Sequence, residues 1–285
     1  MNNANRSEPR QRLVAHLDEL AAGFSGKLAL YVKDLGTGET VERAADAIFP
    51  TASCIKVFVL LELMRRVHRG DFILEQRVPV LASQQAGGSG VLKDLDVGLE
   101  LTLRDTATLM IVLSDNTATN LLVDLLGLEA INTTIAGLGL EKTRMFNKID
   151  FEAIGDDVHR LAVTTAREFG SALEQVARGT FLDGASCEVI IDIMQRQQYL
   201  DLLPRNLPYN PYARELKLPQ ALRIANKTGF YMGVRCDTAL LFLPNTTLVA
   251  TALTKDSRDL TFRVDNEAAV LLGRVGLALY EHFSA

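Results

Sequence analysis

The order of secondary-structure signals along the chain constrains the fold most strongly, because strand patterns lie at both ends and helix patterns fill the middle. Near the N-terminus, apolar alternation predicts a strand at residues 28–35, a turn at Gly36-Thr37-Gly38 and a short return strand through Val41. Near the C-terminus, three further strands are predicted at residues 222–228, 236–243 and 247–254. Since these strands need partners to bury their apolar faces, the pattern predicts an antiparallel sheet built from both ends of the chain.

The remaining segments carry apolar residues at helical spacing. The first predicted helix contains Leu13, Leu17, Leu20 and Ala21, and the others cover residues 55–67, 101–139 (with breaks at Ser114-Asp115-Asn116 and Gly127), 164–177, 185–197 and 266–283. The fold class is therefore α/β of the α+β type, with an antiparallel sheet flanked by helices and an inserted all-helical region. We expect a single domain over residues 1–285, with the sheet part at about 1–50 and 200–285 and the helical part at about 51–199.

Charge and hydropathy exclude several classes of partner. The net charge is -5 and the charged residues are scattered, which predicts no nucleic-acid partner. No stretch approaches the roughly 18 uninterrupted apolar residues of a membrane span. Residues 1–23 read as a polar leader and an amphipathic helix, without the features of a secretory signal. We therefore expect a cytoplasmic protein if this chain is complete, and a periplasmic or secreted one if a signal has been removed.

Cysteine and histidine are few and far apart. The three cysteines, Cys54, Cys187 and Cys236, imply no disulfide framework because they are odd in number and widely spaced. The histidines show no ligand spacing among themselves or with the cysteines: His16, His68, His159 and His282. The sequence predicts neither a metal site nor a cofactor.

One candidate nucleophile lies where a loop turns into the predicted helix at residues 55–67. Ser53 and Lys56 form a Ser-x-x-Lys motif, and residues three apart share one face of a helix, so the hydroxyl and the ammonium can meet. A serine at a helix start also lies near free backbone N–H groups that can stabilise an oxyanion. The alternative interpretation of this motif is a structural N-cap serine followed by an unrelated lysine. A motif this short can occur by chance.

Two further polar motifs interrupt apolar segments. Ser114-Asp115-Asn116 breaks the helical run at residues 101–139, and by itself is equally a hydrogen-bonded turn between two helices. Lys227-Thr228-Gly229 lies in a predicted strand, where a glycine lets another group approach the backbone closely. Each motif is a weak signal alone, but the three occur together, in order, at a helix start, an inter-helix turn and a strand.

This combination of motifs resembles the class A β-lactamases and penicillin-binding proteins. The resemblance covers nearly the whole chain, since the segment 88–92 (Gly-Ser-Gly-Val-Leu) and the helical stretch up to Gly139 also look like that family. It implies a serine hydrolase with a β-lactamase-like fold. Its substrate would be a small β-lactam, peptide amide or ester that carries a carboxylate. The oligomeric state is left open.

The resemblance also implies a role for each motif residue. Ser53 would become acylated, Lys56 would accept its proton, Ser114 would relay a proton to the leaving nitrogen, and Asn116 would hold Lys56 and the substrate amide. Lys227 would bind the substrate carboxylate and favour a neutral Lys56. The implied substrate-binding residues are Thr228, Gly229, Phe230 and Arg235, of which Phe230 would share the oxyanion hole with the N–H of Ser53. Arg235 belongs to a Gly-x-Arg motif on the next strand, in a hairpin one residue shorter than the family's.

One part of the family pattern is missing. Class A β-lactamases deacylate through a glutamate in a Glu-x-x-Leu-Asn loop, and no such string occurs between Glu141 and Thr165. Aligning residues 152–156 with the end of that loop places Asn147 where the glutamate is expected. Asp150 and Glu152 are alternative bases, or else solvated loop charges.

Three functions remain compatible with this pattern. The first is a class A-like β-lactamase, slow in deacylation. The second is a D,D-carboxypeptidase, penicillin-binding protein or other small amide or ester hydrolase on the same scaffold. The third is a β-lactam-binding sensor that is acylated without turnover.

Overall fold

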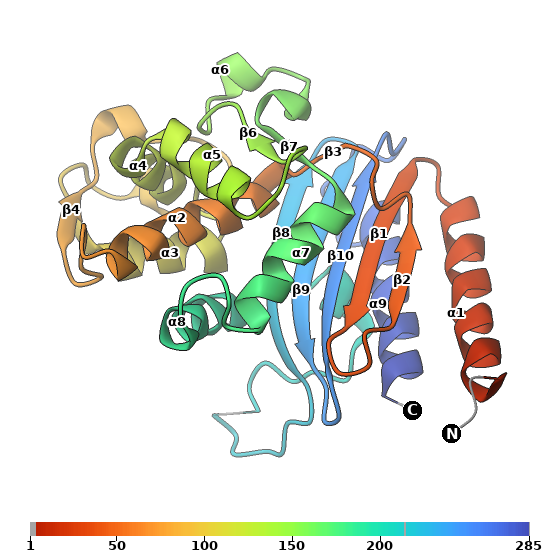
Figure 1. The fold of residues 1–285 in the computed structure, drawn as a ribbon. Coiled ribbons are helices and arrows are strands. Elements are labelled where there is room, and N and C mark those ends of the chain that lie inside the picture. Colours follow the sequence, from red (N-terminus) through yellow and green to blue (C-terminus); the bar gives the residue numbers. More distant parts are fainter. Residues whose placement is uncertain (1–3, 214, 285) are drawn as a thin grey trace.

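The computed structural model describes residues 4–213 and 215–284, and the side chains from residue 8 onward. Its centre is a five-stranded antiparallel sheet in the order β2-β1-β10-β9-β8 (Figure 1). The strands are β1 (Lys27–Asp34), β2 (Thr40–Arg43), β8 (Arg223–Tyr231), β9 (Val234–Phe242) and β10 (Thr247–Lys255). The prediction of an antiparallel sheet from both ends of the chain is confirmed, and β1 pairs directly with β10.

The two terminal helices cover one face of this sheet. Helices α1 (Ala4–Ala22) and α9 (Glu267–Phe283) pack against each other, and their leucines share an apolar core with alternate residues of the sheet (Figure 1). The amphipathic helix expected near the N-terminus is therefore present. The leader that precedes it, residues 1–3, lies outside the described residues.

The inserted region supplies the other helices: α2 (Lys56–His68), α3 (Leu103–Val112), α4 (Asn116–Leu126), α5 (Leu128–Gly137), α7 (Ala166–Ala177) and α8 (Gly184–Gln195). The predicted breaks at Ser114-Asp115-Asn116 and Gly127 separate α3, α4 and α5. Helices α7 and α8 lie within the predicted helical part, yet α7 packs on β1 and β10, and α8 packs on β8. The described helices include none long and apolar enough to cross a membrane.

Short elements that the sequence did not indicate complete the fold. A small sheet joins β3 (Phe49–Pro50), β7 (Ala162–Thr164) and β6 (Arg144–Met145), and β4 (Arg77–Pro79) pairs with β5 (Glu100–Thr102). One turn of helix, α6 (Phe151–Ile154), lies in the loop between β6 and β7. Strands of two or three residues are too short to show a period in the sequence.

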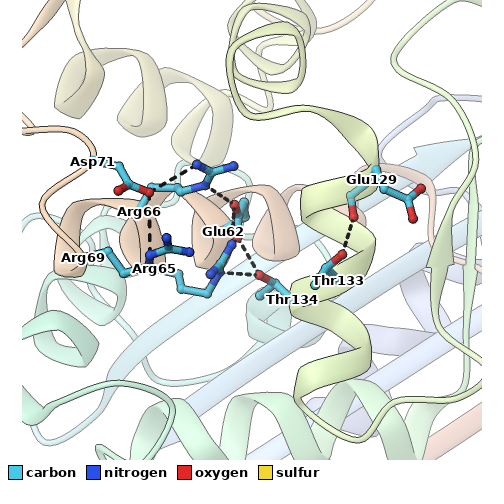
Figure 2. A network of polar contacts seen from close by, with 8 residues as sticks. All are labelled: Glu62, Arg65, Arg66, Arg69, Asp71, Glu129, Thr133 and Thr134. Atoms are coloured by element: carbon cyan, nitrogen blue, oxygen red, sulfur yellow. Dashed lines mark hydrogen bonds and ion pairs between the residues drawn. The ribbon is translucent and has the colours of Figure 1, made fainter.

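Helix α2 is buried along most of its length, and Glu62 in its middle is a buried carboxylate. Glu62 is 0% exposed and accepts hydrogen bonds from Arg65, Arg66 and the hydroxyl of Thr134 on α5 (Figure 2). Burial opposes ionisation of this carboxyl, but the bonds from Arg65, Thr134 and Arg66 outweigh it and lower the Glu62 pKa. This network fixes α2, and with it the start of the helix, against α5.

Candidate active site

Ser53 lies in a strained turn at the start of α2. After β3 the chain passes through Ala52, whose φ of 42° is in the left-handed region, and a short 3-10 turn (Ala52–Ile55) leads into the helix. The neighbours Ala52 and Cys54 are buried, whereas Ser53 keeps part of its surface and lines the main cleft. Ser53 is therefore the partly exposed residue between two buried neighbours in this turn, and it opens into the cleft.

Gly229 allows strand β8 to pack against this turn. A Cβ atom at position 229 would lie 2.7 Å from the carbonyl oxygen of Thr51 and 3.0 Å from the backbone nitrogen of Ser53. Both contacts are to backbone, which has little freedom to move away. The glycine of the Lys-Thr-Gly motif is thus required by the close approach of β8 to Ser53.

Lys56, three residues after the nucleophile, is completely buried. Its Nζ donates to the carbonyl oxygen of Ser114 at 2.6 Å, to Ser114 Oγ at 3.1 Å and to Asn116 Oδ1 at 2.7 Å. Burial, and then the charge of Lys227, lower the Lys56 pKa well below its usual value, while Asp115 opposes this. A lysine in this state gives up its proton readily and can act as a base.

The Ser-Asp-Asn motif forms the expected turn between α3 and α4. Ser114 has a φ of 53°, and Asp115 caps α4 by accepting from the N–H of Ala118. The second Asp115 oxygen accepts from the N–H groups of Val91 and Leu92, which holds the segment 88–92 against the motif. The turn is therefore both structural and part of the site, because Ser114 and Asn116 line the cleft.

Lys227 reaches the same serine from the sheet. Its Nζ donates to Ser114 Oγ at 3.0 Å and to the carbonyl oxygen of Thr228 at 2.7 Å. Burial lowers the Lys227 pKa to about 8, with the nearby Cys54 and Asp237 acting in the opposite direction. Ser114 Oγ thus connects the two buried lysines, which is the geometry of a proton relay.

Arg235 occupies a different environment from Lys227. The β8–β9 register pairs Phe230 with Arg235 and Lys227 with Thr238, so the two cationic side chains lie on opposite faces of the sheet. The Arg235 guanidinium donates to the carbonyl oxygens of Tyr231, Val234 and Thr261, and lies between the rings of Phe230 and Phe262. A direct role of Arg235 in substrate binding stays a prediction.

Of the two remaining substrate-binding predictions, Phe230 is among the residues that line the cleft and Thr228 is not. Thr228 is fully buried, and its hydroxyl has no hydrogen-bond partner among the described residues. Phe230 lines the cleft together with Ser53, as a shared oxyanion hole requires.

The position of Asn147 in the loop between β6 and β7 corrects the sequence alignment. The Asn147 side chain donates to the carbonyl oxygen of Arg160 and lines a separate shallow depression, so Asn147 does not face Ser53. Ile149 lines the cleft instead. Asn120, one turn after Asn116 on α4, fixes this position by bonding both the N–H and the carbonyl oxygen of Ile149.

The alternative bases lie away from the nucleophile. Asp150 accepts from the N–H groups of Glu152 and Ala153 and so caps α6, while Glu152 is exposed; neither lines the cleft. Among the described residues that line the cleft, the carboxylate is that of Asp201, whose charge acts on Arg235. Sequence reasoning missed Ile149 and Asp201. Asn120 was a usable signal for the register, because it shares a helix face with Asn116.

Among residues 4–213 and 215–284, no group of three or more histidine, cysteine, aspartate or glutamate side chains could hold a metal ion. The cysteines Cys54, Cys187 and Cys236 are all free thiols, and all are buried.

Fold and site together define a serine hydrolase of the class A β-lactamase type. Comparison with known proteins then gives the family: residues 12–283 match the model of the β-lactamase enzyme family, and the chain belongs to it.

Individual relatives agree with this family. The chain is 27% identical to a β-lactamase of Bacillus licheniformis over 271 residues, which cover 90% of this chain and 83% of the relative. A β-lactamase structure from Sphaerobacter thermophilus superposes with a TM-score of 0.82 at 30% identity, covering 95% of both chains. A leucine-to-glutamate mutant of PBP-A, described as an acyl-enzyme complex with penicillin G, has a TM-score of 0.82 at 26% identity over 96% of both chains.

Proposed function

We propose that β-lactams acylate this hydrolase at Ser53 and that the resulting acyl-enzyme is hydrolysed slowly. In acylation, neutral Lys56 takes the Ser53 proton and the oxygen attacks the lactam carbonyl. The lactam C–N bond then breaks, Ser114 Oγ gives the leaving nitrogen its proton, and the Lys56 ammonium returns a proton to Ser114 Oγ. The contacts of Ser114 with both Lys56 and Lys227 support this relay.

The single observation that carries the slow second step is the position of Ile149. Deacylation needs a base that activates a water near the ester, and general-base catalysis typically contributes about 10²–10⁴-fold. Ile149 lines the cleft together with Ser53 and Asn116, and its side chain can neither accept a proton nor hold a water. The other loop residues that line the cleft are also apolar: Phe151, Ile154, Val158 and Leu161. Asp150 and Asp157 form hydrogen bonds within the loop, and no loop carboxylate is among the described residues that line the cleft. The groups proposed for acylation, Ser53, Lys56 and Ser114, are therefore present, whereas hydrolysis of the acyl-enzyme ester lacks a base.

The similarity to PBP-A supports a second candidate, a penicillin-binding D,D-peptidase or related amide or ester hydrolase. The PBP-A structure has a TM-score of 0.82 over 95% of this chain. Both candidates use the same Ser53 ester and differ in the natural acyl donor and in the fate of the β-lactam adduct.

Intact-protein mass spectrometry after mixing with benzylpenicillin tests the proposal. The expected result is an adduct of one penicillin mass that forms quickly and disappears slowly, with release of the hydrolysed product. An adduct that never decays favours the peptidase or the sensor function. An adduct too short-lived to detect, with fast product formation, contradicts slow deacylation.

A further inference from the structure

The carboxylate of Asp201 lies in the cleft without a protein partner. Asp201 lines the cleft together with Ser53 and is half-buried, and its Oδ1 has no hydrogen-bond partner among the described residues. Burial lowers the pKa of the neighbouring Arg235, and the charge of Asp201 opposes this, but the guanidinium donates to three backbone carbonyl oxygens instead. Because desolvation of an unpaired charge is costly, a carboxylate in this setting favours a cationic partner that enters the cleft.

Three aromatic side chains line the same cleft. Tyr199, two residues before Asp201, makes an edge contact with Phe230, with their ring centroids 6.2 Å apart. The Arg235 guanidinium carbon lies 5.2 Å from the ring centroid of Phe230 and 4.9 Å from that of Phe262, so both rings contact one cation. These contacts join the four cleft residues into one group, which we call the aromatic–carboxylate cluster: Tyr199, Asp201, Phe230 and Phe262.

Strand β8 brings this cluster close to the nucleophile. Phe230 follows Gly229, where an added Cβ atom would lie 3.0 Å from the backbone nitrogen of Ser53. Successive residues of a strand are about 3.3 Å apart, so Phe230 lies one residue from this close approach. A ligand that acylates Ser53 can therefore place a second group against the aromatic–carboxylate cluster without leaving the cleft.

Charge and ring chemistry define the ligand of the cluster. Asp201 is the one charged side chain among the described residues that line the cleft. The two buried lysines, Lys56 and Lys227, bond Ser114 and do not line it. Aromatic rings carry partial negative charge on their faces and attract cations, including alkylammonium groups. An anionic or neutral group bound here would leave Asp201 without a partner.

From these observations we infer that the aromatic–carboxylate cluster is a subsite for an alkylammonium group of the ester or amide that acylates Ser53. Asp201 supplies the opposite charge, and the three rings supply cation–π contacts. The inference rests on the proposed acylation of Ser53 and names its substrate class, an acyl compound that carries a positively charged nitrogen. Recognition of a carboxylate by Lys227 is a separate prediction, and both can act on one zwitterionic substrate.

Two matched pairs of substrates test the subsite, one for each part of an acyl compound. In the acyl pair, 4-nitrophenyl 4-(trimethylammonio)butanoate is compared with 4-nitrophenyl 5,5-dimethylhexanoate, in which carbon replaces the charged nitrogen. In the leaving-group pair, acetylthiocholine is compared with 3,3-dimethylbutyl thioacetate, which differs in the same way.

The chemistry is the same in all four reactions. Ser53 Oγ bonds the acyl carbon, Lys56 takes the Ser53 proton, and the bond from the acyl carbon to the leaving oxygen or sulfur breaks. Nitrophenolate leaves as the anion, whereas the thiolate takes a proton from Ser114 Oγ, which regains one from Lys56. Single-turnover release of nitrophenolate or thiol therefore measures acylation alone.

In at least one pair the ammonium compound should acylate Ser53 more efficiently than its neutral isostere. Asp201→Asn should lower this ratio about tenfold, the rate equivalent of about 1.4 kcal/mol. Comparing the ratio between variants cancels the intrinsic reactivity of the two compounds, and the pair that shows the preference identifies the part of the substrate that carries the cation. Phe262, 64% exposed, can be replaced without loss of core packing. Phe262→Leu should lower the ratio about two- to fivefold, and it carries the test if Asp201→Asn does not fold.

Asp156→Asn is the matched control. Burial, and then the charge of Asp156, raise the pKa of Tyr231, which lines the cleft, whereas Asp156 itself is exposed and does not line it. This variant removes the same charge near the cleft and should keep the ratio of the parent protein. No preference in either pair, a ratio that Asp201→Asn leaves unchanged, or an equal loss in Asp156→Asn overturns the subsite while leaving Ser53 acylation standing.

A competition experiment gives a readout that does not depend on these esters. A cleft of about 380 Å³ holds one drug-sized ligand, so butyltrimethylammonium bound at the cluster should slow the formation of the benzylpenicillin adduct. Sodium chloride at equal ionic strength should not slow it, and Asp201→Asn should relieve the slowing. Adduct formation that butyltrimethylammonium does not slow overturns the subsite. If neither benzylpenicillin nor any of the four acyl compounds modifies Ser53, the proposed function and the subsite fail together.

Discussion

Replacing Ile149 by glutamate should convert a slow acyl-enzyme into one that turns over. The backbone at this position is already fixed, because Asn120 bonds its N–H at 2.8 Å and its carbonyl oxygen at 2.9 Å. A glutamate there would project into the cleft toward Ser53 and Asn116, where a water can attack the ester. If it acts as a general base, the steady rate should rise by about 10²–10⁴-fold.

The same replacement has a cost that the structure allows us to estimate. Ile149 is 5% exposed, so the variant gives up most of the burial of one isoleucine side chain, worth about 1.5–3 kcal/mol. A carboxylate near Lys56 would also favour the ammonium form and raise the Lys56 pKa. The initial burst should therefore keep its amplitude of about one equivalent and slow slightly toward acid pH.

Rapid-mixing kinetics with a chromogenic cephalosporin measure both phases in one trace. The parent protein should show a burst followed by a much slower steady phase, and Ile149→Glu should raise the steady phase alone. Asn147→Glu is the matched control, because its side chain lies in the depression outside the cleft and should leave both phases unchanged. Fast linear turnover in the parent, or acceleration by Asn147→Glu instead of Ile149→Glu, would refute the reasoning.

Three further predictions follow from the buried charges. Lys227→Ala should lower kcat/KM for anionic β-lactams about ten- to a hundredfold, because one charge-assisted contact of about 1.5–3 kcal/mol is lost. The decrease in kcat/KM should be smaller for neutral esters. Equal decreases for both substrate classes would mean that Lys227 acts through Lys56 or through the fold. The acylation rate should fall as pH drops through the lowered Lys56 pKa, because the protonated amine is no base. The rate for carboxylate substrates should also fall as pH rises through the Lys227 pKa of about 8. A pH–rate profile for neutral esters should therefore show the decrease at low pH and lack the decrease at high pH. The pKa of Glu62 is lower in the folded than in the unfolded protein, so the Glu62 carboxylate stabilises the fold above its unfolded-state pKa and stops doing so as pH falls through its folded-state pKa. Urea titrations should show that Glu62→Gln lowers the free energy of unfolding by about 1.5–3 kcal/mol at pH 7 and by less in acid. An equal loss at both pH values would contradict this.

The sequence predicted the long elements well because their patterns repeat over several turns or strand periods. The apolar run of α2, the two breaks that separate α3, α4 and α5, and the final three strands all lie within a few residues of the predicted ranges. The helices α7 and α8 were expected, but their packing on the sheet depends on contacts that no local pattern encodes.

In the candidate active site, too, local sequence motifs were predicted and contacts between distant residues were not. The three motifs were readable because each is local. The structure joins Lys56, Ser114, Asn116 and Lys227 in one hydrogen-bonded group, and Ser53 lines the cleft with Ser114 and Asn116. The predicted place of Asn147 in the site was wrong because the loop is held by Asn120, which bonds Ile149 across 29 positions of sequence. The hydrogen bond from the Tyr231 hydroxyl to the carbonyl oxygen of Gly155 spans 76 positions, and nothing in the sequence near either residue indicates the other.

The most direct test of this account is to locate the acyl group after reaction with benzylpenicillin. Peptide mapping by mass spectrometry should find one penicilloyl adduct, on Ser53, and Ser53→Ala should show none while keeping the parent's circular dichroism spectrum and melting temperature. An adduct on any other residue, or undiminished labelling of a folded Ser53→Ala protein, would contradict the assignment of the nucleophile on which the proposed chemistry rests.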